Sequence, residues 1–345
     1  MPREFDPAGP GCSDDGIYGL PYTEDEARLV YLPVPWEATT SYGGGAALGP
    51  SAIRTASAQL DLYDADVEKP YAAGLYLRDE SREVKAWNKA AKAAAQKAIK
   101  ALTAGKPAPA SALKTANSLG DKLNAWVYAQ TRGLIAAGKI PALIGGDHST
   151  PYGAIQAAVE RWPGLGILHF DAHHDTRNAY EGFTWSHASI FHNVMERLPV
   201  GRLVQVGIRD FSHDEKLYCQ GLGKRCTVFY DGDLARRRFA GKTFDSTAAE
   251  VVAGLPKDVW VSFDIDGLDP RFCPGTGMPV PGGLEFSEAN HILRTVAASG
   301  RRIVGFDLNE VAPQKGSEWD ANVGARLLYK MTAWCLASQG LAKVL

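Results

Sequence analysis

The most constraining feature of this chain is a repeated order of short apolar runs, most of them followed by a stretch of helical composition. The runs are rich in β-branched residues and bounded by Gly, Pro or Asp, which is typical of buried strands. They span residues 29–34, 73–77, 140–144, 165–170, 203–207, 227–230, 259–263 and 303–306. Helical stretches such as 150–161, 246–254 and 287–298 lie between them. This order predicts an α/β fold, a single three-layer αβα sandwich around a mainly parallel, roughly eight-stranded sheet.

One segment, residues 83–138, is rich in Ala and Lys and is interrupted by Gly105-Lys106-Pro107-Ala108-Pro109. Because proline and glycine end helices, this segment is predicted to form two long helices joined by a turn. The sequence contains no internal repeat and no linker long enough to separate two domains. We therefore expect residues 1–345 to form a single domain, with a helical insertion around residues 83–138.

The composition excludes several classes of function. With 45% hydrophobic and 22% charged residues and a formal net charge of -2, the chain is typical of a soluble globular protein. The sequence has no Lys/Arg block that predicts nucleic-acid binding, no apolar run that predicts a membrane span, and no secretory signal in residues 1–19. The five cysteines (Cys12, Cys219, Cys226, Cys273 and Cys335) are scattered without a C-x-x-C pair. We expect a cytoplasmic protein without a disulfide framework or a thiolate metal site.

Histidines and aspartates gather where the predicted strands end. Seven of the 8 histidines fall between His148 and His213. The segments that follow four of the strands are Gly145-Gly146-Asp147-His148-Ser149, Asp171-Ala172-His173-His174-Asp175, Asp264-Ile265-Asp266-Gly267-Leu268-Asp269-Pro270 and Asp307-Leu308-Asn309-Glu310. Ligands of open parallel sheets bind outside the carboxyl ends of the strands, so these segments are the candidate functional site.

The residue types in these segments favour a metal centre. In extended backbone, residues two apart share a face, so the polar side chains of the second segment converge, as do the first two aspartates of the third. The candidate ligands are His148, Asp171, His173, Asp175, Asp264 and Asp266. Two imidazoles and four carboxylates suit Mn²⁺, Ni²⁺, Fe²⁺ or Co²⁺ better than a structural zinc ion. Four carboxylates repel one another unless roughly two dications about 3.5–4 Å apart neutralise them, the spacing that activates a water near neutral pH.

Each segment also has a structural interpretation. The first could be a helix start capped by Asp147 or Ser149, and Asp269 before Pro270 could begin a turn. The second has little structural reason for its charges, because close buried charges are costly without a compensating ion. His174 lies on the opposite parity and is expected beside the ligands or in packing, whereas His169, inside a strand, is expected to be a hydrogen-bonded core histidine.

Taken together, three motifs resemble the ureohydrolases, the family of arginases, agmatinases, guanidinobutyrases, formimidoylglutamases and guanidine hydrolases. They are Gly-Gly-Asp-His-Ser, Asp-Ala-His-x-Asp and the segment from Ser262 and Phe263 to Asp269 and Pro270. The stretch from Ser41-Tyr42-Gly43 to Gly49-Pro50-Ser51-Ala52-Ile53-Arg54 is similar to the family's N-terminal loop and helix. The resemblance covers most of the chain and implies an arginase-like fold.

The resemblance implies a role for each site residue. One metal would be bound by His148, Asp171, Asp175 and Asp264, and the other by Asp171, His173, Asp264 and Asp266, with Asp171 and Asp264 bridging. The catalytic residues would be His187, Asp266 and Glu310, of which Glu310 receives the guanidinium and His187 shuttles a proton, with His192 as its nearest rival. Residues expected to contact substrate are Glu310, His187, Trp185 and Asp210.

The substrate is inferred from differences within the family. Arginases hold the amino-acid end of arginine partly through two aspartates after a Gly-x-Arg segment, and here Asp210 keeps the first while Ser212 stands at the second. Phe183 and Trp185 precede His187, and Trp36, Tyr42 and Tyr180 lie in candidate rim loops. An aromatic rim offers no partner for an amino-acid tail, although aromatic residues are dominant core fillers and most of these rings could instead be core. Residues 32–43 look most like the guanidine hydrolase branch, which is often nickel-dependent and includes enzymes that cleave biguanides such as metformin.

These features indicate a hydrolase with two divalent ions per chain, Ni²⁺ or Mn²⁺, that releases urea plus ammonia or an amine from a small guanidine compound, foremost guanidine. Alternatives are a substituted guanidine or biguanide (metformin, agmatine, guanidinobutyrate) as substrate, or a structural subunit of a hetero-oligomeric ureohydrolase. Phosphoester hydrolysis would need cations near the metals, for which Arg177 and Arg209 are candidates. The resemblance implies a homo-oligomer, a trimer or hexamer, and leaves a related second subunit as an alternative.

Overall fold

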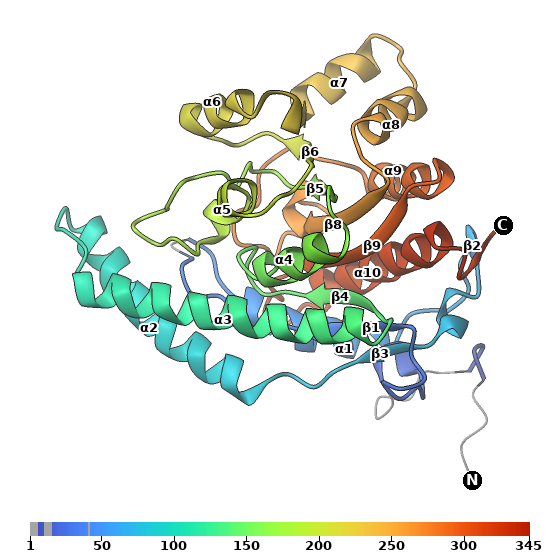
Figure 1. Ribbon diagram of the computed structural model, residues 1–345, viewed down its shortest axis with the longest axis horizontal. Helices are drawn as coiled ribbons and strands as arrows, with labels where there is room; N and C mark the ends of the chain where they lie inside the picture. The colour runs from blue at the N-terminus through green and yellow to red at the C-terminus, as the bar shows by residue number, and fades with distance from the viewer. Residues whose placement is uncertain (1–5, 10–15, 41) are drawn as a thin grey trace.

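The centre of the computed structural model is one sheet of eight parallel strands in the order β3-β1-β4-β9-β8-β5-β6-β7 (Figure 1). The structure describes residues 6–9, 16–40 and 42–345, so that Cys12, Ser41 and most of residues 1–15 lie outside it. The strands of this sheet are β1 Leu29–Pro33, β3 Leu75–Leu77, β4 Ile140–Ile144, β5 Gly166–Phe170, β6 Arg202–Ile208, β7 Cys226–Tyr230, β8 Asp258–Asp264 and β9 Arg302–Asn309. All eight predicted strands are therefore present, and the predicted α/β fold is confirmed.

Helices cover both faces of the sheet (Figure 1). They are α1 Gly49–Ser57, α2 Arg82–Thr103, α3 Ala110–Ala136, α4 Tyr152–Arg161, α5 Ile190–Arg197, α6 His213–Gly221, α7 Asp231–Phe239, α8 Phe244–Ala253, α9 Phe286–Ala298 and α10 Trp319–Ser338. Contacts join α1, α8, α9 and α10 into one layer and α3, α4 and α5 into the other. The side chains of β5 alternate accordingly, since Leu168 and Phe170 join one apolar core while Ile167 joins the other.

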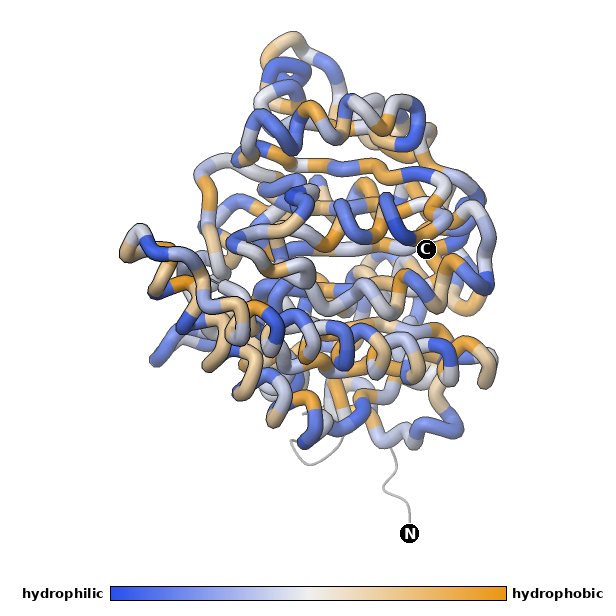
Figure 2. The backbone as a smooth tube through the Cα atoms, turned by 60° about the vertical axis from the view of Figure 1, so that its left-hand side comes forward, coloured by the Kyte–Doolittle hydropathy of each residue, from blue (hydrophilic) through white to orange (hydrophobic). Residues whose placement is uncertain are grey.

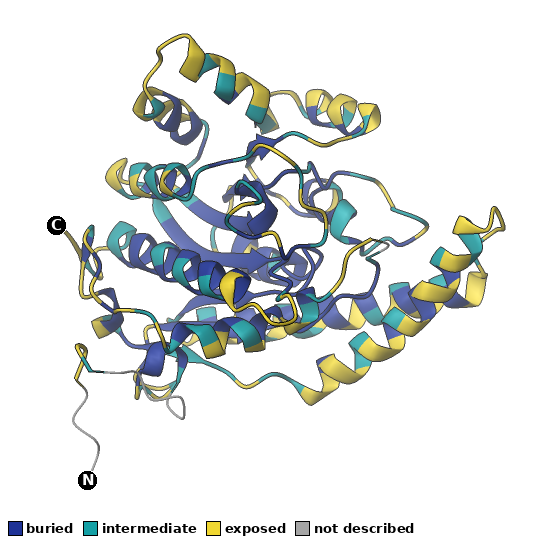
Figure 3. Cartoon of the chain, turned by 180° about the vertical axis from the view of Figure 1, so that it is seen from behind, coloured by how far each residue is buried: buried dark blue, intermediate teal, exposed yellow. Residues whose placement is uncertain are grey.

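The predicted helical segment forms α2 and α3, which run side by side and are joined by a turn (Figure 1). The Ser81 side chain accepts a hydrogen bond from the Val84 amide and so caps the start of α2. Small residues such as Ala95 and Ala98 line the buried face of α2 and allow close packing. The outer faces of both helices are largely exposed, whereas the strands are buried (Figure 3).

Two short strands were not predicted. β2 Val67–Glu68 pairs antiparallel with β10 Lys343–Val344 near the C-terminus. Two residues are too few to give a strand pattern, and only tertiary contact defines them. The predicted strand at 73–77 begins two residues later, because Pro70–Ala73 forms a 3₁₀ turn that ends at Gly74 with φ 79°.

Apolar segments gather in the interior and polar ones along the outer helices (Figure 2). No helix in the described part of the chain is long and apolar enough to cross a membrane. The four described cysteines, Cys219, Cys226, Cys273 and Cys335, are free thiols.

Candidate metal centre and active site

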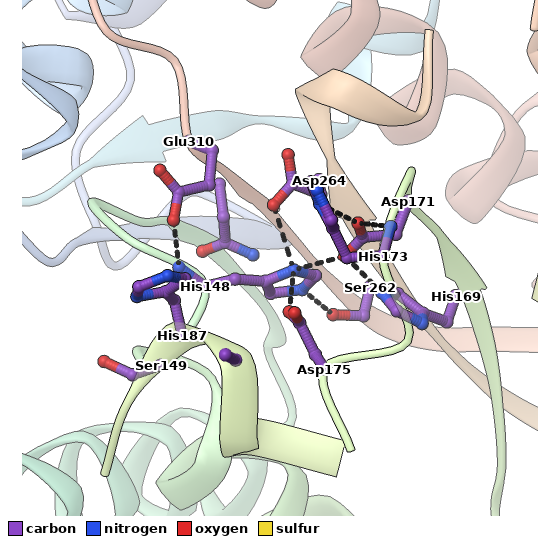
Figure 4. Close-up of polar contacts among 12 residues, drawn as sticks. His148, Ser149, His169, Asp171, His173, Asp175, His187, Ser262, Asp264 and Glu310 are labelled. Carbon is purple, nitrogen blue, oxygen red and sulfur yellow. Dashed lines mark hydrogen bonds and ion pairs between the residues drawn. The ribbon is translucent and has the colours of Figure 1, made fainter. Parts of the chain in front are cut away.

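The four strands that end in the predicted site segments are neighbours in the sheet. Their order β4-β9-β8-β5 occupies its middle. All run parallel, so their carboxyl ends lie at one edge and bring together residues as distant in sequence as His148 and Glu310, which are 162 positions apart. Five of the six predicted metal ligands and Glu310 are seen together at this edge in Figure 4, and Asp266, the sixth, lies beside His173.

The first group of ligands converges on the ring of His148. Its Nδ1 atom lies 3.1 Å from Asp171 Oδ2, 3.3 Å from Asp175 Oδ2 and 3.2 Å from Asp264 Oδ2. Figure 4 shows Asp264 and Asp175 approaching this ring from opposite sides. One nitrogen and three carboxylate oxygens facing a common point fit a divalent cation of the manganese or nickel type.

The second group surrounds His173. Its Nδ1 atom lies 3.1 Å from Asp266 Oδ2 and 3.4 Å from Asp171 Oδ1. Asp264, the second predicted bridging ligand, reaches this group only through its Oδ1 atom, which accepts a hydrogen bond from the Asp266 amide. Asp171, Asp266 and one ring nitrogen of His173 form a second cluster with metal-ligand spacing. Asp171 therefore presents one oxygen to each group, as a bridging ligand requires.

Backbone amides fix the direction of three of the carboxylates. Asp171 Oδ1 accepts a hydrogen bond from the His173 amide at 2.6 Å, and Asp264 Oδ1 accepts from the Asp266 amide at 2.9 Å. Asp266 Oδ1 accepts from the Ala172 amide at 3.0 Å, which connects two strand ends. Asp264 and Asp266 thus each have one oxygen held and the other aimed into the site. Both oxygens of Asp171 face ligand groups, and the His173 amide orients one of them. Little side-chain freedom therefore remains to be lost on binding a cation.

Behind His148, a chain of hydrogen bonds sets the ring's tautomer. The Ser262 hydroxyl donates to Asp307 Oδ1 at 2.7 Å and lies 2.9 Å from His148 Nε2, so its oxygen accepts a hydrogen bond from the N–H group at that nitrogen. The Asp307 carboxylate is also held by Trp260 and Asn309. Burial lowers the pKa of His148, but its contacts with Asp171, Asp175 and Asp264 outweigh burial and raise the net pKa well above the usual value. A divalent cation among these carboxylates would replace the proton on Nδ1 and leave this nitrogen as its ligand. No role was predicted for Ser262 or Asp307, although polar residues inside apolar strand runs were a usable signal.

His169 and His174 are joined by Gln205. The amide nitrogen of Gln205 donates to His169 Nδ1 at 2.9 Å, and its oxygen lies 2.7 Å from His174 Nδ1. His169 Nε2 then donates to Asp171 Oδ2 at 2.8 Å. As expected, both histidines are buried and hydrogen-bonded beside the ligands, but sequence patterns did not predict that Gln205 orients them.

Burial and mutual repulsion dominate the electrostatics of the site. Burial raises the pKa of Asp264 well above its usual range, and the charges of Asp266 and Asp171 add to the effect. Burial and the Asp171 charge raise the pKa of Asp175 to about 7. Burial lowers the pKa of His173, but the charge of Asp266 outweighs it and the net pKa is raised to about 12. So dense an anionic cluster requires added positive charge, and the residues present fit two divalent cations.

A cavity of about 260 Å³ opens directly on these carboxylates. Glu310, whose φ of 62° is left-handed, projects into it from the end of β9. Its Oε1 atom accepts a hydrogen bond from the His148 amide at 3.0 Å, while its buried Oε2 atom has no hydrogen-bond partner among the described residues. A buried carboxylate oxygen without a donor is costly, so this atom is positioned to receive a donor from a ligand.

His187 lines the same cavity, and His192 does not belong to its lining. The Ser186 side chain caps the 3₁₀ turn His187–Ser189 that carries the histidine. Burial, with the positive charge of His173, lowers the pKa of His187 to about 4, so its ring is neutral near pH 7 and has one ring nitrogen without a proton. The ring of His192 instead packs on Tyr218, with ring centroids 4.7 Å apart.

The structure places Trp185, the predicted substrate contact, outside the lining of the cavity. Its indole nitrogen donates to Asp121 at 2.7 Å, and its ring packs against Tyr152 and Arg197, away from the cavity lining. Packing against α3, α4 and α5 buries more of this ring than a position at the cavity rim would.

Of the other aromatic residues considered for the rim, two line the cavity and two do not. Tyr42 and Tyr180 line the cavity, whereas Trp36 and Phe183 are buried in the apolar cores. Asp210 lines the cavity with its side chain 62% exposed.

Comparisons with known proteins agree with this geometry. Residues 27–333 match the model of the arginase family. The chain is 30% identical over 316 residues to N(1)-aminopropylagmatine ureohydrolase of Thermus thermophilus, covering 91% of this chain and 92% of that relative. The structure of proclavaminate amidinohydrolase from Streptomyces clavuligerus superimposes with a TM-score of 0.73 at 24% identity, over 96% and 99% of the two chains. That of agmatine ureohydrolase from Thermoplasma volcanium gives 0.71 at 23% identity, over 92% and 93%. The chain therefore belongs to the arginase family of ureohydrolases.

Proposed function

We propose that this chain hydrolyses a compact guanidino compound, foremost guanidine itself, to urea and ammonia. A substituted guanidine would give urea and an amine by the same bond cleavage. The observation that carries this proposal is the buried Oε2 atom of Glu310, which faces the cavity and lacks a donor among the described residues. A guanidinium ion is planar, cationic and rich in N–H donors, so it matches this carboxylate.

Two divalent ions, Mn²⁺ or Ni²⁺, would be held by the six ligands described above. When bound, such ions polarise the substrate and make water nucleophilic near neutral pH. The residues of the chain then perform the remaining steps. Glu310 binds and orients the guanidinium, and the neutral ring of His187 accepts a proton and passes it to the departing nitrogen.

The size and the rim of the cavity support a compact substrate. At about 260 Å³ it lies below the range of roughly 300–1,000 Å³ that is typical of ligand pockets. Ser212, which stands where arginases carry a second aspartate, donates its hydroxyl to Glu215 in the capping box of α6 and is occupied there. Arg177 lines the mouth and adds positive charge. None of these features favours an α-ammonium group.

A substituted guanidine is the second candidate, and Asp210 is the observation that favours it. This carboxylate is exposed at the cavity and lies 3.9 Å from His173 Nε2, where it could pair with the cationic end of an agmatine-like substrate. The names of the relatives point in the same direction.

A purely structural subunit is disfavoured, because such a subunit has no physical need to keep six ligands aligned. A cytoplasmic homo-oligomer, a trimer or hexamer, remains part of the proposal.

Urea release from a panel of guanidino compounds tests the proposal. We expect guanidine or a short alkylguanidine to give a kcat/KM at least about tenfold above that of arginine, or roughly 1.4 kcal/mol of transition-state discrimination. Protein loaded separately with Mn²⁺ and Ni²⁺ should be assayed with guanidine, agmatine, 4-guanidinobutyrate, metformin and arginine. Efficient arginine hydrolysis with little urea from guanidine would contradict the substrate assignment.

Glu310→Gln is expected to lower kcat/KM by about 10²-fold, chiefly through KM, because an amide oxygen keeps the bond from the His148 amide but loses the charge that binds guanidinium. Metal content should stay unchanged. Steady-state kinetics with metal analysis measures both effects. An unchanged KM would show that the guanidinium binds elsewhere.

A further inference from the structure

An ion pair between a half-buried lysine and a buried carboxylate connects α2 to the segment that follows β1. Lys92 Nζ lies 2.6 Å from Glu37 Oε1, and the Glu37 side chain is only 1% exposed. One helical turn earlier, Asn88 Oδ1 accepts a hydrogen bond from the Glu37 backbone amide at 2.8 Å. Residues four apart share one helix face, so α2 grips both the backbone and the side chain of Glu37.

Glu37 in turn organises the loop beyond it. Its Oε2 atom accepts hydrogen bonds from the Gly45 amide at 2.8 Å and the Ala47 amide at 3.2 Å, and its Oε1 atom accepts from the Thr40 hydroxyl at 3.2 Å. Burial alone would raise the pKa of Glu37, but Lys92 and the two amides lower it on balance, so the carboxylate is charged near pH 7. The Glu37 carboxylate thus holds the loop, and Lys92 of α2 neutralises its charge.

This loop forms one wall of the cavity. Thr40 and Tyr42 line it together with Glu310. Gly43, with φ 57°, packs so closely on Gly277 that a Cβ there would lie 2.2 Å from the Gly277 carbonyl oxygen. A Cβ at Gly277 would lie 3.0 Å from Glu310 Oε2. Close contacts therefore run from α2 through Glu37 to the cavity wall beside Glu310 Oε2, the atom that has no hydrogen-bond partner among the described residues.

We propose that Lys92 and Asn88 are positioning residues for substrate, acting through Glu37 on the cavity wall formed by Thr40 and Tyr42. The kinetic part of this proposal rests on the proposed function above. Neither residue touches a candidate metal ligand, so α2 sets how tightly substrate is held rather than how the chemistry proceeds. In this way α2 has a role in the active site, although its outer face is exposed to solvent.

Lys92→Met, compared with Lys89→Met on an exposed position of the same helix, tests this role. In Lys92→Met we expect KM to rise about 5- to 20-fold, with kcat within about threefold of the wild type and two ions still bound. Hydrogen exchange of the amides of Gly45 and Ala47 should become faster, because their acceptor loses its counter-ion. Lys89→Met should change neither quantity.

A double variant separates positioning from general loss of structure. Glu37→Gln removes the buried charge but keeps an oxygen that the loop amides can reach, so Glu37→Gln in the Lys92→Met background should recover part of the lost affinity and protection. Additive losses in the double variant, or an unchanged KM in Lys92→Met, would overturn the proposal. Hydrogen exchange needs no substrate, so it tests the loop connection even if no guanidino compound is hydrolysed.

Discussion

Asp171→Ala is expected to remove both divalent ions and to lower urea release by more than about 10³-fold, or roughly 4 kcal/mol of transition-state stabilisation. The reason is that its two oxygens serve both ligand groups, with Oδ2 3.1 Å from His148 Nδ1 and Oδ1 3.4 Å from His173 Nδ1. Asp264→Ala is expected to act similarly. His148→Ala removes a ligand from one group alone and should retain part of the metal content.

Metal analysis of the purified variants, alongside urea assays, measures these effects. Asp79→Ala is a suitable control, because this side chain is 96% exposed. It should bind two ions per chain and keep wild-type activity. A wild-type protein that is fully active with one tightly bound ion would contradict the dinuclear centre.

Much of the fold was predictable because local patterns carry it. A strand buried on both faces is mainly apolar, and each of the six inner strands of the large sheet has at least five buried residues in a row, whereas the edge strands β3 and β7 are only partly buried. The ligands were predictable for a related reason, since charged residues directly after such runs have no structural explanation at a strand end. The strand order was not predictable in this way. Nothing in the sequence near β9 says that it lies between β4 and β8, yet this order alone brings Glu310 against His148.

The position of Trp185 outside the cavity lining shows a limit of reasoning from neighbours in sequence. Phe183, Trp185 and His187 lie two residues apart, which would place them on one side of an extended strand. In the structure their directions differ, because Phe183 packs with α2 and α3, Trp185 bonds to Asp121 of α3, and His187 faces the cavity. Packing against distant helices, rather than local parity, decides where each ring points.

His187→Ala is expected to lower kcat by about 10²–10⁴-fold while both ions remain bound, because a proton shuttle assists chemistry without being a ligand. The geometry supports this separation, since the two ligand groups form around His148 and His173 and do not include His187. The cavity left by the missing ring should admit free imidazole, so added imidazole is expected to restore part of kcat.

His192→Ala is the matched control for His187→Ala, because this histidine lies on the next helical turn but packs on Tyr218 outside the cavity lining. Its kcat should stay within about threefold of the wild type. Loss of metal from His187→Ala would reassign that residue as a ligand, and a kinetic defect confined to His192→Ala would move the shuttle to α5. The proposed shuttle predicts three results for His187→Ala that His192→Ala should not show: both ions are retained, kcat is lowered, and imidazole restores part of it. These results together would assign the proton transfer to His187, which lines the same cavity as Glu310.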